Sequence, residues 1–240
     1  MNLHIKILFF FGLFCCTNLI AKVSYFNNEI YTDSIRDTIL TKSEINKIFT
    51  DNVLNEIGIQ YPIFRIYSFS DKESKQYIIF TENVIKGNIE DEHSLKKNIK
   101  AFNISFLKDK QIKTNWTITD FIDETEKSIS FWTRYLSLTD IDNDGYIDPI
   151  IVYGTKSLYG EDFEEGRVKI LVYYLGKKIA IRHQNSTIDD GRHTQIDKTF
   201  FYLPTKLKKK VYNIILSLEE NGHSLFNTET IEKIRKSLKN

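Results

Sequence analysis

The sequence predicts an α+β fold made mainly of antiparallel β-sheet, with one N-terminal helix and two C-terminal helices. Strand-like segments follow one another through the middle of the chain with short turns between them. Apolar residues at helical spacing occur on either side of this middle region. The chain lacks the strand–helix alternation that a parallel α/β sheet requires, so the strands are expected to pair antiparallel.

The first predicted helix covers residues 43–57. Apolar residues between Ile45 and Ile57 recur at the three- and four-residue spacing of one helix face. Thr41 and Glu44 form a capping-box pattern before them, and Gly58 follows the last apolar residue. We expect a single helix with one buried stripe.

Strand patterns fill the centre of the sequence. Phe102, Ile104 and Phe106 alternate with Asn103 and Ser105, which predicts a half-buried strand. Two further runs flank Leu175-Gly176-Lys177 and predict a hairpin. The expected strands are 63–67, 77–80, 102–106, 112–118, 129–138, 150–153, 168–175 and 178–182. Trp116 and Trp132 lie in such patterns, and we expect packed rather than sugar-stacking roles for them.

Two helices are predicted to close the chain. Leu207, Val211 and Leu218 belong to one apolar helical stripe that starts near Pro204. The basic run Lys206–Lys210 is expected to form a solvated face of this helix. A last short helix should follow Asn227.

The charge balance is close to zero. The chain has 240 residues with 33 Lys and Arg against 32 Asp and Glu, a formal net charge of +1. This balance argues against nucleic acid as a partner. We expect one domain over residues 22–240.

Residues 1–21 have the layout of a secretory signal peptide. Lys6 precedes an apolar run at 7–16, and Ala21 offers a small residue before a cleavage point. The run is too short to cross a bilayer, so the mature chain is expected to have no transmembrane span. The protein should be exported to the periplasm, the cell surface or the medium. Lipid attachment at Cys15 or Cys16 is the alternative, which the bulky Phe14 disfavours.

The strongest motif is the acidic loop at residues 140–148, with the sequence DIDNDGYID. Asp140, Asp142, Asp144 and Asp148 stand at the positions of carboxylate ligands in a calcium loop, and Gly145 permits the sharp turn. Tyr146 would contribute its main-chain carbonyl. We therefore expect the loop to bind Ca²⁺ in a structural role. The competing interpretation is a surface turn that is merely rich in acid.

The residues around this loop depart from an EF-hand. Position 12 is Ile151 instead of a bidentate Glu, and strands are expected on both sides of the loop. The loop resembles the strand-to-strand calcium loops of FG-GAP and related extracellular repeat families. Those families repeat the loop around a propeller, whereas this chain contains one copy.

A second polar cluster follows the predicted hairpin. Its candidate ligand-binding residues are Arg182, His183, Asn185, Asp189, Arg192, His193 and Asp197. A His beside a carboxylate can transfer protons, and Arg can bind carboxylate or phosphate. No spacing matches a zinc site or a nucleophile elbow. The simpler interpretation is a polar loop whose Arg–Asp pairs maintain its own shape.

A likeness to one known family is carried by the segments 131–133, 140–154, 177–185, 197–198 and 202–204. Through these segments the chain resembles an exported bacterial family of surface polysaccharide biosynthesis proteins. This resemblance implies a role with lipopolysaccharide or capsule at the cell envelope, without a defined reaction or catalytic residues. A glycan or an envelope protein would be the partner.

Three functions remain open at this point. The first is a calcium-stabilised, non-catalytic envelope protein. The second is a glycan-acting enzyme that uses His183 or His193 with Asp189, Asp190 or Asp197. The third is a protein-binding module, which an exposed apolar patch without a cleft would favour.

Overall fold

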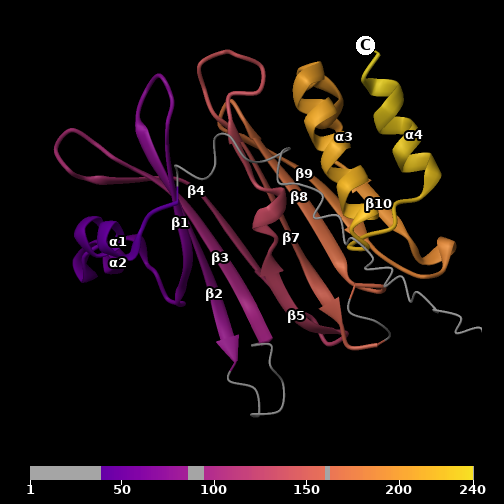
Figure 1. The fold of residues 1–240 in the computed structure, drawn as a ribbon, viewed down its shortest axis with the longest axis horizontal. Helices are drawn as coiled ribbons and strands as arrows, with labels where there is room; N and C mark the ends of the chain where they lie inside the picture. The colour runs from indigo at the N-terminus through magenta and orange to yellow at the C-terminus, as the bar shows by residue number, and fades with distance from the viewer. Residues whose placement is uncertain (1–38, 86–94, 160–162, 240) are drawn as a thin grey trace, which may run out of the picture. The chain divides into compact units, whose positions relative to one another are not determined.

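A computed structural model describes residues 39–85, 95–159 and 163–239. By its contacts the chain divides into Met1–Ile30 and Tyr31–Asn240, and every described residue belongs to the second unit. The predicted signal peptide at 1–21 lies outside the described residues. The predicted mainly antiparallel α+β fold is confirmed (Figure 1).

The first sheet contains four antiparallel strands in sequence order: β1 (Ile63–Ser70), β2 (Lys75–Ile85), β3 (Leu95–Phe106) and β4 (Ile112–Phe121). The β1–β2 connection (71–74) and the β3–β4 connection (107–111) are short, which allows each of these pairs of consecutive strands to lie side by side. A turn at Lys108–Lys110, with Lys110 at a positive φ of 66°, joins β3 to β4.

The second sheet has the order β10-β9-β8-β7-β5, and β6 also pairs with β7. The predicted hairpin is confirmed, because Leu175 and Gly176 adopt φ values of 47° and 72° between β8 and β9. Two positive φ values in a two-residue loop match the twist of paired strands. The strands are β5 (Glu126–Phe131), β6 (Ser137–Thr139), β7 (Asp148–Ser157), β8 (Arg167–Tyr174), β9 (Lys177–Gln184) and β10 (His193–Ile196).

The two sheets share an apolar core. One cluster joins side chains of the first sheet, such as Phe80 and Ala101, with side chains of the second, such as Phe131 and Leu171. The other face of the first sheet packs against the N-terminal helices through Phe49 and neighbouring residues. The other face of the second sheet packs against the C-terminal helices (Figure 1). Each sheet is therefore covered on both faces.

The N-terminal helical segment differs from the prediction of one helix. It forms two short helices, α1 (Lys42–Ile48) and α2 (Asp51–Ile57). Phe49 leaves the helical conformation with φ −104° and ψ 73°, and its buried ring contacts Tyr77 of β2 at 5.4 Å between centroids. A second helix then begins after Thr50, which occupies the N-cap position of α2. The predicted capping box between Thr41 and Glu44 is present.

The strands depart from the prediction in two places, one in burial and one in extent. Asn103 and Ser105 were expected on an exposed face of β3, but they are 0% and 4% exposed because the second sheet covers that face. The segment 129–138 is not one strand. A 3₁₀ turn at Thr133–Tyr135 divides it into β5 and β6.

The C-terminal helices are α3 (Thr205–Glu220) and α4 (Thr228–Ser237), as predicted. Pro204 and Asn227 are their N-cap residues. The expectation of a fully solvated basic face is wrong at Lys208, which is 4% exposed. Its ammonium donates a hydrogen bond to the carbonyl of Ser237. A cation at this position satisfies a carbonyl at the helix C-terminus and complements the helix dipole.

None of the helices in the described part of the chain has the length and apolarity that crossing a bilayer demands.

A buried ion cluster links three strands. Arg167 of β8 makes two hydrogen bonds to Glu126 of β5, at 2.5 and 2.6 Å. Its Nη1 also lies 3.7 Å from Asp120 of β4, to which Lys169 donates at 2.6 Å. Burial alone would raise the pKa of Asp120, but the Lys169 ammonium keeps this pKa below its usual value. The cluster connects the two sheets through charged groups that compensate one another.

We expect Glu126→Gln to destabilise the protein, because it leaves the partly buried Arg167 without its main counter-charge. The loss should be about 3 kcal/mol, at the lower end for a broken buried pair. Urea unfolding measures it, with Glu124→Gln as the control because Glu124 is exposed. Equal stability of the two variants would contradict a structural role for this pair.

Candidate metal centre

The acidic loop connects β6 to β7, so the predicted strand-to-strand setting is correct. Asn143 and Gly145 adopt positive φ values of 69° and 89°. The second value is rarely accessible to residues with a Cβ atom, and a Cβ at Gly145 would also lie 3.0 Å from the Lys72 side chain. The turn that the sequence assigns to Gly145 therefore exists.

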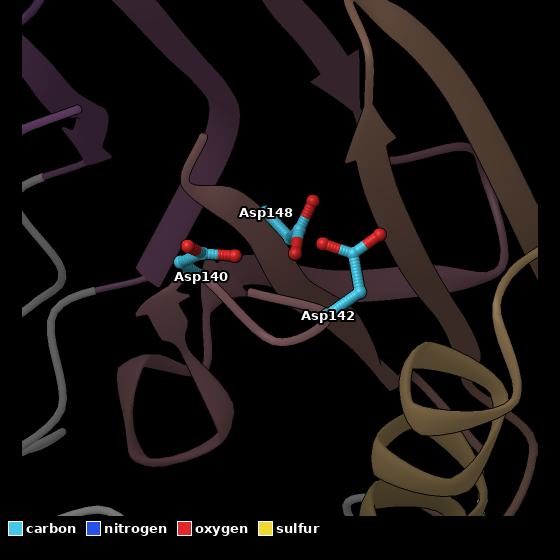
Figure 2. A group of neighbouring side chains, drawn as sticks. All are labelled: Asp140, Asp142 and Asp148. Atoms are coloured by element: carbon cyan, nitrogen blue, oxygen red, sulfur yellow. The ribbon is translucent and has the colours of Figure 1, made fainter. Parts of the chain in front are cut away.

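Three carboxylates of the loop converge. One oxygen from each of Asp140, Asp142 and Asp148 lies within 4.8 Å of the others. Figure 2 shows these side chains turned toward a common space, with Asp148 at the start of β7. Asp148 is 2% exposed, whereas Asp140 and Asp142 are half-buried. Oxygen atoms gathered in this way suit a hard divalent cation.

Backbone amides of the same loop hold the carboxylates in place. Asp140 accepts hydrogen bonds from the N–H groups of Asn143, Asp144 and Gly145 at 2.8–3.0 Å. Asp148 accepts from the N–H of Ile141 at 2.9 Å. These bonds offset part of the negative charge and fix the orientation of both side chains.

Asp148 is the most buried of the three carboxyl groups. Burial is the main cause that raises its pKa to about 6, and the nearby Asp142, Asp144 and Asp140 raise it further. The bond from Ile141 opposes this change without cancelling it. A buried carboxyl near like charges favours either a proton or a cation.

Two residues from other elements contact the loop. Lys72 lies in the β1–β2 turn. Its backbone N–H donates a hydrogen bond to the main-chain carbonyl of Gly145, and its ammonium donates to the main-chain carbonyl of Asp144. The ammonium also lies 3.6 Å from the centre of the Tyr146 ring. Tyr174 of β8 donates its hydroxyl to Asp142 at 3.0 Å. The loop is therefore attached to both sheets.

The predicted ligands do not all converge. Asp144 lies outside the group of three, and its carboxylate accepts from the N–H of Tyr146 at 2.8 Å. The Tyr146 hydroxyl donates to Glu73 at 2.7 Å. A ligand role for Asp144 and for the Tyr146 carbonyl stays a prediction from the motif.

The second predicted cluster is divided among internal pairs. Arg182 donates to Asp197 at 2.7 Å, and Asp197 also accepts from the N–H of Ala180. Arg192 donates to Asp189 at 3.0 Å and to the carbonyls of Ser186 and Thr187. Asn185 is buried and bonds to the backbone of Phe163 and Leu225. These contacts shape the segment after β9.

The two histidines of this cluster differ in exposure. His183 is 2% exposed, stacks on Phe226 at 4.2 Å and shares a hydrogen bond with Thr194, whereas His193 is exposed. Both line a shallow cavity of about 220 Å³, together with Arg167, Lys169 and Arg182. No carboxylate is among the described residues that line it. The His–carboxylate pair of the enzyme hypothesis is not assembled there.

Sequence reasoning missed the residues that other elements bring to the acidic loop. Lys72 and Glu73 lie 72 and 73 positions from their partners Asp144 and Tyr146, and Tyr174 lies 32 positions from Asp142. Nothing in their local patterns distinguishes these three residues. The motif identified the loop itself because its residues are consecutive.

Comparison with protein-family models, with curated proteins and with solved structures finds no match to this chain.

Burial lowers the pKa of His183 to about 4, so the folded protein keeps this ring neutral while the unfolded chain protonates it near 6.5. We expect His183 to stabilise the fold fully above pH 6.5 and to lose this contribution as the pH falls toward 4. The loss approaches about 3 kcal/mol.

Urea unfolding of the wild type and of His183→Gln at pH 7, 5.5 and 4 measures this effect. The difference at pH 7 gives the packing cost of the substitution. A difference that stays constant down to pH 4 would contradict the expected titration.

Proposed function

We propose that this protein is an exported cell-envelope protein whose 140–148 loop binds a structural Ca²⁺ ion. The observation that carries the proposal is the convergence of Asp140, Asp142 and Asp148 within 4.8 Å. The motif contributes further ligand positions at Asp144 and Tyr146. Millimolar extracellular calcium is sufficient for weak sites of this kind.

Calcium would stabilise the junction of the two sheets. The loop begins after β6 and ends in β7 of the second sheet, while Lys72 attaches it to the β1–β2 turn of the first. The ion would relieve the repulsion around buried Asp148 and fix this junction. Both cysteines precede the expected cleavage point, so a mature chain would depend on such a contact in place of a disulfide.

The cellular setting follows from the sequence patterns. The basic, apolar and small-residue order of 1–21 supports export. The likeness to surface polysaccharide biosynthesis proteins supports a role with lipopolysaccharide or capsule. We propose a supporting, non-catalytic role in that process.

We expect calcium to raise the melting temperature of the exported chain relative to chelator. At ten to a hundred times Kd the gain is about 1.4–2.7 kcal/mol, or about 3–10 °C for a domain of this size. Differential scanning calorimetry measures it. Magnesium at the same concentration should have a smaller effect, because it demands stricter octahedral geometry.

Asp142→Asn and the double variant Asp142→Asn, Asp144→Asn test the site directly. Each should weaken calcium binding by about tenfold or more, because ligand charge sets the affinity of such loops. Asp109→Asn is the matched control, since Asp109 caps a β-turn through the N–H of Gln111. Calorimetric titration that finds no binding by the wild type would refute the proposal.

Calcium binding should depend on pH through Asp148. Its pKa of about 6 predicts that apparent affinity falls about tenfold between pH 7 and pH 5, because the protonated carboxyl is not a ligand. Without calcium, the quantity that changes with pH is the stability of the fold, and the contribution of Asp148 to it rises as the pH falls. The raised folded-state pKa makes this group favour folding more at pH 5 than at pH 7.

Titrations at both pH values, with and without chelator, separate these effects. In chelator, Asp148→Asn should abolish the part of the stability change that this carboxyl causes. Calcium affinity that is equal at pH 5 and pH 7 would contradict the role of Asp148.

A further inference from the structure

A cavity of about 450 Å³ lies beside the acidic loop. Its wall includes Tyr146, Ile147 and Pro149 at the end of the loop, residues of the β1–β2 turn, and Leu175-Gly176 of the β8–β9 turn. Strand β4 contributes residues 113–116. This volume falls within the range of small-molecule binding sites.

Stacked aromatic rings form one side of the cavity. The rings of Trp116 and Tyr173 lie 4.0 Å apart between centroids, at an interplanar angle of 14°. Trp116 packs against Tyr173 as the sequence predicts, but it is only half-buried and also borders the cavity, which the prediction of a purely packed role did not include. The Tyr173 hydroxyl is buried and has no hydrogen-bond partner among the described residues. Tyr173 is only 4% exposed, so the half-buried Trp116 supplies the accessible aromatic surface of this side, and such a ring combines a rigid apolar face with a polar margin.

Planar polar side chains form another part of the lining. Gln76 donates to Asp71 at 2.7 Å, and Asn115 donates to Gln76 at 3.3 Å and to Asn103 at 2.7 Å. Asn103 is fully buried, and its own amide makes only a long contact of 3.4 Å with the carbonyl of Tyr77. Side-chain amides and carboxylates arranged in a chain present donors and acceptors side by side.

A β-bulge creates this arrangement. Asn103 pairs with Trp116, but the next residue of β3, Ile104, pairs with Thr114, which leaves Asn115 as the extra residue. Ile112, before the bulge, packs on the side of the N-terminal helices, whereas Trp116 and Ile118 pack between the sheets. Without the bulge, Ile112 and Trp116 would share one face. The irregularity thus brings Trp116 to the cavity and Asn115 to Asn103.

The charges of the lining disfavour an anionic ligand. Asp71 and Glu73 border the cavity with Lys113 as the one lining cation among the described residues. A neutral molecule with several hydroxyl groups matches this chemistry, since each hydroxyl both donates and accepts. Its C–H surfaces would pack on the aromatic rings.

We propose that this cavity binds a neutral saccharide unit, with Trp116 as the packing surface and Asp71, Gln76 and Asn115 as hydrogen-bonding groups; the buried Tyr173 and Asn103 hold Trp116 and Asn115 in position. This proposal goes beyond calcium binding and does not depend on it, although the loop supplies one wall. Binding of the saccharide orders these groups through hydroxyl contacts and involves no covalent step.

The test uses the exported chain in calcium buffer and four neutral disaccharides: maltose, cellobiose, lactose and N,N′-diacetylchitobiose. Binding is measured by saturation-transfer NMR and by fluorescence in the Trp132→Phe background, where Trp116 is the remaining tryptophan. We expect saturable binding of at least one disaccharide at millimolar concentration and a change in Trp116 emission. No binding by any of the four would overturn the proposal.

Variants locate the binding. Trp116→Ala and Asn115→Ala should each weaken affinity by about tenfold, consistent with the loss of one stacking or hydrogen-bonding group. Asn221→Ala removes a comparable amide from the end of α3, outside the cavity lining, and should leave affinity unchanged. Binding that both cavity variants retain in full would overturn the assignment, as would a stronger response to digalacturonate than to all neutral probes.

Repeating the titration in chelator separates the two proposals. Disaccharide binding without any calcium-dependent melting would refute the calcium proposal alone. Calcium-dependent melting without disaccharide binding would refute the saccharide proposal alone.

Discussion

The fold depends on the apolar contact between the two sheets. Each sheet buries one face against the other, through residues such as Phe80 on one side and Leu171 on the other. Polar groups that enter this layer must find partners there, because an unpaired buried charge is costly. Glu126 and Asp120 meet this requirement through Arg167 and Lys169. The same charged groups fix how β4 of one sheet meets β8 of the other.

The acidic loop between β6 and β7 also brings charged groups close together, in this case carboxylates of like charge. Its carboxylates repel one another, and backbone N–H groups offset part of that repulsion at Asp140. The pKa of Asp148 stays raised because this carboxyl is buried among like charges. Under the proposed calcium binding, the ion would replace a proton at Asp148 with little rearrangement of the loop. Its contacts with Lys72 and Tyr174 would transmit the added order to both sheets.

The cavity shows how an irregular strand creates chemistry at the margin of a regular core. The bulge at Asn115 interrupts the alternation of β4, and the polar chain from Asp71 to Asn103 passes through it. The other polar segment, around Arg182 and Asp197, uses comparable residues to satisfy its own backbone and charges. Residue types alone do not separate these two outcomes. The groups of both segments bond to one another, but those beside β4 also border the larger cavity, of about 450 Å³, together with Trp116.

Local patterns in the sequence determined the antiparallel α+β class, the β8–β9 hairpin, both C-terminal helices and the position of the acidic loop. Each of these depends on residues that are close in the chain, such as the turn at Leu175-Gly176. Tertiary structure alone decided the break at Phe49, the burial of Asn103 and Lys208, and the meeting of Trp116 with Tyr173. These features arise from contacts between distant segments, whose energies exceed the local preferences that a sequence pattern records.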